Sequence, residues 1–287
     1  MAEIITSAQN PKIKKLLALQ QKSSERRESG LFVVEGVREL QHCIEAGYEV
    51  DTVFQLSPQS WSSERGDMHP CRWEGPTEWE GACPSEAPVC GTPGRGPKLF
   101  EVSPAVYEKI AYRGSTEGVI AEVRAKELTL ESLALGENPL VVVLESVEKP
   151  GNLGAVLRSA DAAGADAVII CDPLTDLYNP NLIRASIGGI FSVPCIACSS
   201  EEAISFLKSK GIQILTAQLQ DSSLYYDRDM TKGTAIVMGT ESTGLTDVWR
   251  KAADAHIRIP MLGRLDSLNV SVSAAILLFE AVRQRNG

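Results

Sequence analysis

The alternation of apolar and polar residues is most regular in the second half of the chain. From residue 140 onward, short apolar runs alternate with longer stretches in which apolar residues recur at helical spacing. The runs predict strands at residues 140–144, 167–171, 212–216, 235–238 and 256–259, with a further short strand near residues 193–197. Apolar strands that alternate with helices indicate a parallel sheet covered on both faces. The predicted fold class is therefore α/β.

The first part of the chain also contains regular elements, interrupted by one irregular stretch. Residues 1–56 are typical of helix, strand, helix and strand, and residues 100–124 add a helix and a strand. Between them, residues 57–98 are rich in Pro, Gly, Ser, Trp and Cys without any period, which predicts a long insertion. The expected organisation is a small α/β domain over residues 1–125, a linker over 126–139 and a second domain over 140–287.

The loop after the first predicted strand of the second domain carries polar residues next to glycines. Asn152 is suited to cap the following helix, and Gly154 permits close packing of that helix. The apolar positions of the helix face the core and leave Arg158 to one side. Two interpretations stay open for this loop alone: a structural arginine on a helix face, or a nucleotide site, although the motif GxGxxG is absent.

Two later loops have the same layout of strand, glycine-bearing loop and helix. In the first, Gly239 lets a ligand approach the backbone, and Glu241 places an acid at the end of a strand. In the second, Ser267 and Asn269 precede the apolar run of the last helix, which is a helix N-cap signal. Each loop alone also fits an ordinary turn or cap. Because ligands of parallel sheets lie outside the carboxyl ends of the strands, the loops together predict one site.

Considered together, these loops have the residues and the order of a known family. Residues 140–285 resemble the SpoU (also called TrmH) family of RNA ribose 2′-O-methyltransferases, within the SPOUT class. The residues 3–56 and 100–124 resemble the ribosomal-protein-L30-like substrate-binding domain that often precedes it in members acting on ribosomal RNA. The matching motifs are NLGAVLR at 152–158, MGTESTGL at 238–245, and IPMLG at 259–263 with SLNVS at 267–271.

The resemblance implies a fold, an assembly and a cofactor. The fold would be a parallel sheet with a deep trefoil knot near the C-terminus, and the assembly a homodimer with the active site near its interface. The cofactor would be S-adenosylmethionine, cradled by the knotted loops, and no metal is required. The implied cofactor-binding residues are Gly239, Ile259 and Leu268, with Met238, Met261 and Asn269 beside them.

The resemblance also assigns catalytic roles. Arg158 is the residue tied to activating the 2′-hydroxyl. Because an arginine with an ordinary pKa is a poor base, we expect it to hold the adjacent phosphate and the developing alkoxide. Glu241 would orient Arg158, while Asn152, Ser267 and Asn269 would shape the site through hydrogen bonds.

The charge of the chain bears on which part of its surface would bind RNA. The formal net charge of −9 argues against coating a nucleic acid over the whole surface but allows a local basic patch. Such a patch is predicted in the first domain, where Lys14, Lys15 and Arg26 would contact phosphates; a solvated helix face is the alternative. Ribosomal RNA is the favoured substrate, and transfer RNA methylation or RNA binding without catalysis are the alternatives.

The cysteines and the chain start give weaker signals. Cys195 and Cys198 have the spacing of a zinc knuckle, but no second CxxC or HxxxH pair follows them. Two small residues in or beside a buried strand are therefore the favoured interpretation. A metal site formed by Cys71, Cys83 and Cys90 with Cys43 or His69 matches no established spacing. The first residues lack the apolar core of a signal peptide and no apolar run could span a bilayer, so we expect a cytoplasmic protein without a membrane partner.

Overall fold

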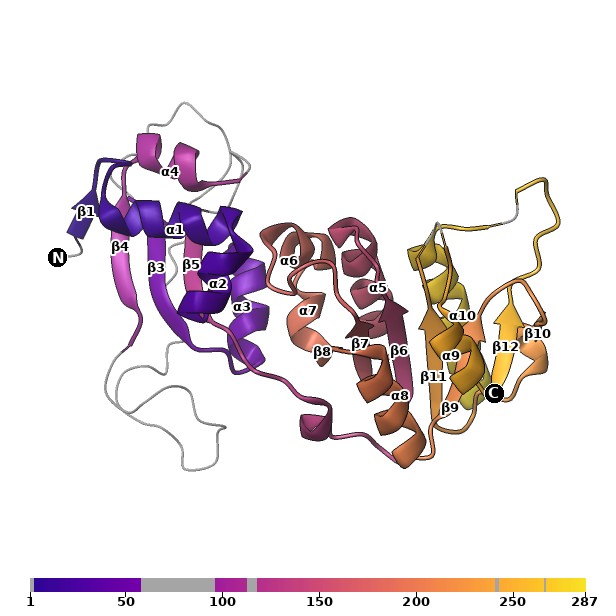
Figure 1. Ribbon diagram of the computed structural model, residues 1–287. Coiled ribbons are helices and arrows are strands. Elements are labelled where there is room, and N and C mark those ends of the chain that lie inside the picture. The colour runs from indigo at the N-terminus through magenta and orange to yellow at the C-terminus, as the bar shows by residue number, and fades with distance from the viewer. Residues whose placement is uncertain (1–2, 58–95, 113–117, 241–242, 266) are drawn as a thin grey trace. The chain divides into compact units, whose positions relative to one another are not determined.

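The computed structural model describes residues 3–57, 96–112, 118–240, 243–265 and 267–287 (Figure 1). The chain forms two compact units. The first comprises Met1–Lys126 and Tyr178–Pro180, and the second comprises Glu127–Leu177 and Asn181–Gly287.

The first unit is built on a sheet with the strand order β1-β4-β3-β5-β2. Its strands are β1 (Glu3–Ile5), β2 (Leu31–Glu35), β3 (Val50–Leu56), β4 (Lys98–Val102) and β5 (Val119–Arg124). Strand β4 runs parallel to β1 and β3, whereas β5 runs antiparallel to β2 and β3. The sequence predicted β2, β3 and β5, but neither β1 nor β4.

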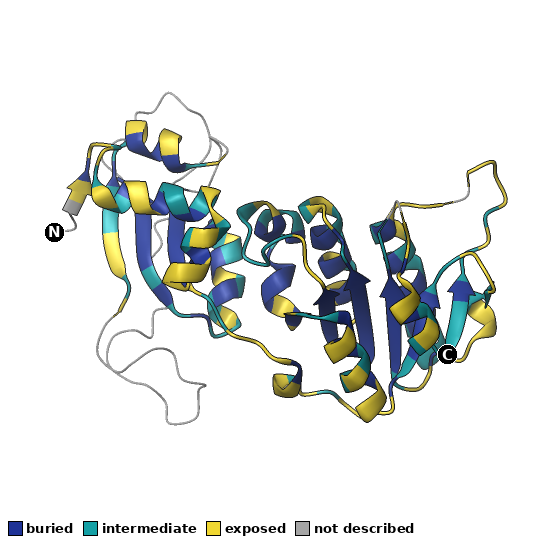
Figure 2. Cartoon of the chain, in the orientation of Figure 1, coloured by how far each residue is buried: buried dark blue, intermediate teal, exposed yellow. Residues whose placement is uncertain are grey.

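Helices cover this sheet with their apolar sides. The described helices of the unit are α1 (Pro11–Gln21), α2 (Ser23–Ser29), α3 (Val37–Glu45) and α4 (Pro104–Ile110). Helix α1 begins after Asn10, whose side chain accepts a backbone hydrogen bond of the first turn, and Pro11 takes an early position in the helix. Ile13 and Leu16 of α1 and Val106 of α4 are buried in one apolar cluster with strand residues. Figure 2 shows buried inner and exposed outer helix faces.

The second unit contains a larger sheet in which all strand pairs are parallel. The strand order is β10-β12-β9-β11-β6-β7-β8. Its strands are β6 (Leu140–Glu145), β7 (Ala167–Cys171), β8 (Cys195–Cys198), β9 (Gln213–Ala217), β10 (Ser223–Leu224), β11 (Thr234–Met238) and β12 (Ala255–Arg258). This arrangement confirms the α/β class with a parallel sheet, including the short strand expected near residues 193–197. The trefoil knot stays a prediction.

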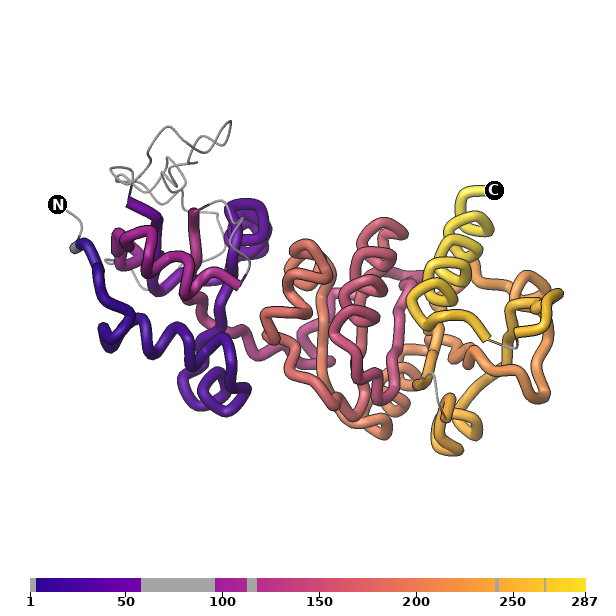
Figure 3. The backbone as a smooth tube through the Cα atoms, turned by 90° about the horizontal axis from the view of Figure 1, so that it is seen from above, coloured from indigo at the N-terminus to yellow at the C-terminus, as the bar shows by residue number. Residues whose placement is uncertain are grey.

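Helices lie on both faces of the parallel sheet. They are α5 (Pro150–Ala162), α6 (Pro180–Ser186), α7 (Gly189–Ser192), α8 (Ser200–Ser209), α9 (Asp247–Ala252) and α10 (Val270–Arg285), with short 3-10 turns η2 (Leu130–Ser132) and η3 (Tyr225–Asp227). Helices α5 and α10 pack side by side on one face (Figure 3). On the other face, Leu207 of α8 and Trp249 of α9 share a buried cluster with Val141, Val143 and Val237 of the strands. Among the described helices, none is both long and apolar enough to cross a membrane.

Gly154 fixes the position of α5 against its neighbour α6. A Cβ atom on Gly154 would lie 2.5 Å from the Ala185 Cβ and 2.7 Å from the Ser186 backbone nitrogen. No side chain fits in that space, so the predicted close packing at this glycine is confirmed. Helix α5 carries Asn152 and Arg158, and this contact therefore helps to position both residues.

Candidate active site

A cleft of about 650 Å³ is formed by residues that follow strands β9, β11 and β12. Clefts of this size hold small organic ligands. Its lining includes Ser267 and all six residues expected to bind the cofactor, which are Met238, Gly239, Ile259, Met261, Leu268 and Asn269. The structure thus brings together residues that are far apart in the sequence. Their roles toward a ligand stay predictions.

The loop after β11 is held in a tight turn beside the cleft. A Cβ atom on Gly239 would lie 2.3 Å from the carbonyl of Gly244, and Gly244 itself has a φ of +67°. The Gly244 amide donates to the Thr240 carbonyl at 3.1 Å, and the Thr240 and Thr243 hydroxyls lie 2.7 Å apart. Glycine at both positions therefore lets the loop close on itself and keeps its backbone at the cleft. Glu241 lies outside the described residues.

A buried carboxylate anchors the far end of the same loop. Glu145, the last residue of β6, is 3% exposed. Its two oxygens accept hydrogen bonds from the Thr246 amide at 2.8 Å and the Thr246 hydroxyl at 2.7 Å. Thr246 is the N-cap of α9, so Glu145 fixes where that helix begins. Sequence reasoning did not single out Glu145, whose only signal is an acid at the carboxyl end of an apolar strand.

Asn269 joins the loop between β12 and α10, here called the third loop, to helix α5. Its amide nitrogen donates to the Asn152 side-chain oxygen at 3.1 Å, although the residues are 117 positions apart. Its own side-chain oxygen accepts from the Ser271 amide at 3.0 Å, which makes Asn269 the N-cap of α10, as predicted. The expected capping role of Asn152 is wrong, because α5 begins earlier, at Pro150, and its N-cap is Lys149. Asn152 instead contacts the third loop.

Arg158 lies on the outer side of α5. The apolar residues Leu153, Val156, Leu157 and Ala160 of this helix are fully buried, as predicted, and Arg158 is exposed. It is not among the residues that line the cleft. The structure thus groups six predicted cofactor residues and Ser267 at the cleft, links Asn152 to them through Asn269, and leaves Arg158 in solvent.

Two buried polar atoms of residues that line the cleft have no hydrogen-bond partner in the described part of the chain. They are the side-chain oxygen of Gln218 and the Nε of Arg250. A buried donor or acceptor without a partner is costly, which favours a ligand that supplies the missing partners. Sequence reasoning missed both residues. Their signal is three-dimensional, because nothing in the local sequence shows whether a polar atom has a partner.

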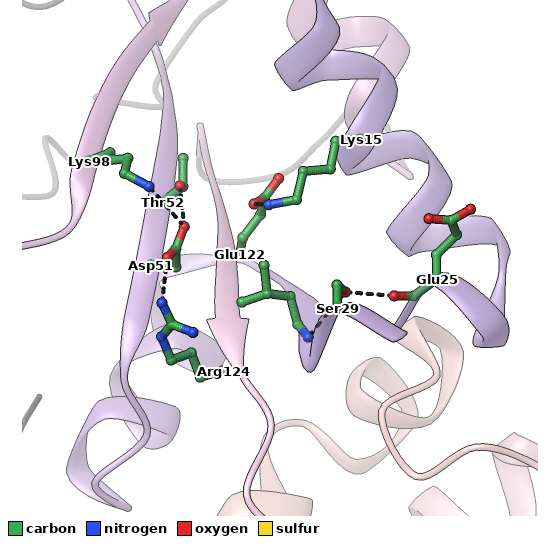
Figure 4. Close-up of polar contacts among 9 residues, drawn as sticks. Lys15, Glu25, Ser29, Asp51, Thr52, Lys98, Glu122 and Arg124 are labelled. Atoms are coloured by element: carbon green, nitrogen blue, oxygen red, sulfur yellow. Dashed lines mark hydrogen bonds and ion pairs between the residues drawn. The ribbon is translucent and has the colours of Figure 1, made fainter. Parts of the chain in front are cut away.

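Of the three residues predicted to contact phosphates in the first unit, Lys15 is paired with an acidic side chain. The Lys15 Nζ lies 2.6 Å from a carboxylate oxygen of Glu122, which is buried on β5 (Figure 4). Burial raises the pKa of the Glu122 carboxyl above its usual value, while the hydrogen bond from Lys15 opposes that rise. Lys14 is exposed.

Arg26 requires a correction. Its side chain is only 6% exposed, and its guanidinium donates hydrogen bonds to the carbonyls of Leu19 and Gln20 near the end of α1. A guanidinium enclosed in this way has no access to an RNA phosphate. Arg26 is therefore a structural residue of the first unit, and the expected phosphate contact is wrong.

The cysteine predictions have separate outcomes. Cys195 and Cys198 are free thiols at the two ends of the parallel strand β8, which confirms their interpretation as strand residues. Cys71, Cys83, Cys90 and His69 lie outside the described residues. Within residues that the structure describes, no group of three or more His, Cys, Asp or Glu side chains is arranged to hold a metal ion.

Comparison with known proteins gives two family matches and relatives that cover most or nearly all of the chain. Residues 139–279 match the SpoU rRNA Methylase family, and residues 10–121 match the MRM3-like substrate binding domain. The 23S rRNA (uridine(2479)-2'-O)-methyltransferase of Streptomyces viridochromogenes is 30% identical over 99% of this chain and 93% of its own length. The 23S rRNA (guanosine-2'-O-)-methyltransferase RlmB of Vibrio parahaemolyticus is 36% identical over 69% of this chain and 80% of its own length.

A solved structure agrees with these relatives. The AdoMet-bound rRNA methyltransferase from Sinorhizobium meliloti has a TM-score of 0.80 and 28% identity, with 98% of each chain covered. The match extends over both units, as does that of the Streptomyces viridochromogenes relative, which covers 99% of this chain. On these grounds, the chain belongs to the SpoU rRNA methylase family.

Proposed function

We propose that the protein transfers the methyl group of S-adenosylmethionine to a ribose 2′-hydroxyl of ribosomal RNA. The observation that carries this proposal is the cleft, where the second and third motifs meet and where Asn269 reaches back to Asn152 of the first motif. The named relatives are 23S rRNA 2′-O-methyltransferases, which favours ribosomal RNA over transfer RNA. Bacterial ribosomal RNA as substrate also favours a cytoplasmic location.

The residues of the cleft fit S-adenosylmethionine. The cofactor presents a purine, a ribose and an amino-acid group, which need backbone contacts, apolar contacts and a few polar partners. Met238, Met261 and Leu268 supply apolar surface, and the glycine at 239 exposes backbone. The side chains of Gln218 and Arg250, each with one unpartnered polar atom, add an amide and a guanidinium to the lining of the cleft. When bound, the cofactor supplies a methyl group already activated by a positively charged sulfur.

The chain's own residues then have to align the ribose 2′-oxygen that accepts the methyl group and stabilise the negative charge that develops on it. Arg158 keeps its guanidinium in solvent on α5, available to an RNA phosphate and to the 2′-oxygen as that oxygen becomes negative. Asn152 and Asn269, joined by their hydrogen bond, hold the first and third motifs at a fixed distance. Ser267 adds a hydroxyl at the cleft, and Glu241 is assigned to orient Arg158.

We also propose a homodimer. Helix α10 and the loop before it expose large apolar side chains in the second unit, with Val272 46%, Phe279 48%, Leu262 97% and Leu265 75% accessible. Exposed apolar side chains grouped on one segment are typical of protein interfaces. Light scattering at several protein concentrations tests the assembly, and a monomer at all of them would contradict it.

A methyl-transfer assay tests the function. Purified protein is incubated with methyl-labelled S-adenosylmethionine and with unmodified ribosomal RNA or transfer RNA, and the labelled nucleotide is mapped by nuclease digestion. We expect label at one 2′-O-methylated nucleotide of ribosomal RNA. Label in transfer RNA alone would overturn the substrate, and RNA binding without any cofactor binding would favour a non-catalytic protein.

A further inference from the structure

The cleft contains a cationic side chain whose partner the described chain does not supply. Arg250 of α9 lines the cleft, its Nε is buried, and no hydrogen bond or ion pair of its guanidinium occurs among the described residues. Arg258, the other arginine of the cleft, differs because its guanidinium donates to the Ser222 carbonyl. Arg250 is therefore the arginine of the cleft that is left for a ligand.

The surroundings of Arg250 select an anionic ligand group. None of the described residues that line the cleft is acidic. A guanidinium in a partly enclosed setting without carboxylates interacts strongly with a carboxylate or phosphate, because its planar donors match two oxygens and few water molecules compete.

We propose that Arg250 binds the carboxylate of the amino-acid part of S-adenosylmethionine. This assignment rests on the proposed function. The carboxylate is the one anionic group of that cofactor, whereas its ammonium and its sulfonium are cations that Arg250 would repel. Arg250 thus becomes a specificity-determining residue, which distinguishes the intact cofactor from an analogue that lacks the carboxylate.

Calorimetric binding of two ligands to the full chain tests the assignment. The ligands are S-adenosylmethionine and decarboxylated S-adenosylmethionine, and no turnover is needed. The wild type should bind the intact cofactor roughly 10- to 100-fold more tightly than the decarboxylated one, as expected for a charged hydrogen-bonded pair. In Arg250→Met this ratio should fall to about 1–2, and Arg250→Lys should retain part of it.

A matched control separates this contact from a general charge effect. Lys251→Met removes the same charge from the next residue of α9, which is exposed and does not line the cleft, and the wild-type ratio should remain. Circular dichroism and thermal unfolding show whether the Arg250 variants fold; Arg250→Lys keeps the test usable if Arg250→Met does not.

The possible results lead to different conclusions. If the ratio of the affinities for the intact and the decarboxylated cofactor stays unchanged in both Arg250 variants, the assignment is overturned. Weakened RNA binding with a lower salt dependence in the same variants would then identify an RNA phosphate as the partner. A wild type that binds both ligands equally also overturns it while leaving the proposed function intact. A wild type that binds neither ligand contradicts the proposed function itself.

Discussion

The basic side chains assigned to RNA or ligand binding have different surroundings in the two units. In the first unit, Lys15 is paired with Glu122, and Arg26 is enclosed and bound to backbone carbonyls. In the second unit, Arg158 and Arg250 have no protein partner among the described residues, one in solvent and the other at the cleft. A cluster of basic residues in a sequence is therefore weaker support for a binding site than a single arginine whose donors the fold leaves unused.

The largest effect on cofactor affinity is expected from adding one methyl group to the loop beside the cleft of the second unit. In Gly239→Ala, the new Cβ would lie 2.3 Å from the Gly244 carbonyl, so the loop beside the cleft has to move. We expect cofactor affinity to fall by at least about 100-fold, because the backbone and side chains around the ligand shift together. Isothermal titration with S-adenosylmethionine measures this loss.

Gly263→Ala is the matched control for that change. Gly263 lies in the third loop, and a Cβ atom there meets nothing within 4 Å. Its affinity for the cofactor should stay within about twofold of the wild type. Wild-type affinity in Gly239→Ala would show that the loop does not bind the ligand.

A smaller effect, on stability, is expected from breaking the ion pair of the first unit. Lys15→Met leaves the Glu122 carboxylate, whose side chain is 3% exposed, without its charged partner. Loss of such a partner typically costs about 1–3 kcal/mol of unfolding free energy. Denaturant unfolding of the variant and the wild type measures the difference.

The loss of unfolding free energy caused by Lys15→Met should grow as the pH rises. Burial already raises the pKa of Glu122 in the folded protein, and removal of Lys15 raises it further. Below the unfolded-state pKa the carboxyl is protonated in both states, so the variant loses little stability there. As the pH rises through the folded-state pKa, the buried group has to ionise and the loss grows. A loss that is equal at pH 4.5 and pH 7.5, or larger at low pH, would contradict this interpretation.

The smallest effect is expected from the exposed part of the basic cluster. Lys14→Glu should weaken RNA binding several-fold and lower the slope of log affinity against log salt by about 1. Filter binding at several salt concentrations measures both quantities. Lys208→Glu, an equal charge change on exposed residue 208 of α8, serves as control. Unchanged RNA binding in Lys14→Glu would make Lys14 part of a solvated helix face.

Elements whose pattern lies in neighbouring residues could be predicted from the sequence alone. Apolar runs located the main strands of the parallel sheet, and Asn269 before an apolar run marked the start of α10. Strand β10 has only two residues and β4 follows directly after an irregular stretch, so neither offers a clear pattern. The error at Asn152 arose because Pro150 begins the helix earlier than an asparagine cap would.

Contacts between residues that are far apart in the sequence, or on different elements, explain what the sequence could not predict. Arg26 and Lys15 share a basic stretch in the sequence. Arg26, on α2, is bonded to carbonyls at the end of the preceding helix α1, whereas Lys15 meets Glu122 at a separation of 107 residues. Resemblance to a family placed Asn152 and Asn269 in one site, but their hydrogen bond depends on how the third loop meets α5. Arg250 was missed because an unused donor is a property of the folded chain.

The most direct test of the central claim separates cofactor binding from methyl transfer in one variant. Arg158→Ala removes an exposed guanidinium that does not line the cleft, so S-adenosylmethionine affinity should remain within about twofold of the wild type. Transfer to ribosomal RNA should fall by about 1000-fold or more, as expected when a group that stabilises developing charge is lost. Transfer at the wild-type rate in Arg158→Ala, with the cofactor bound normally, would contradict the assigned site.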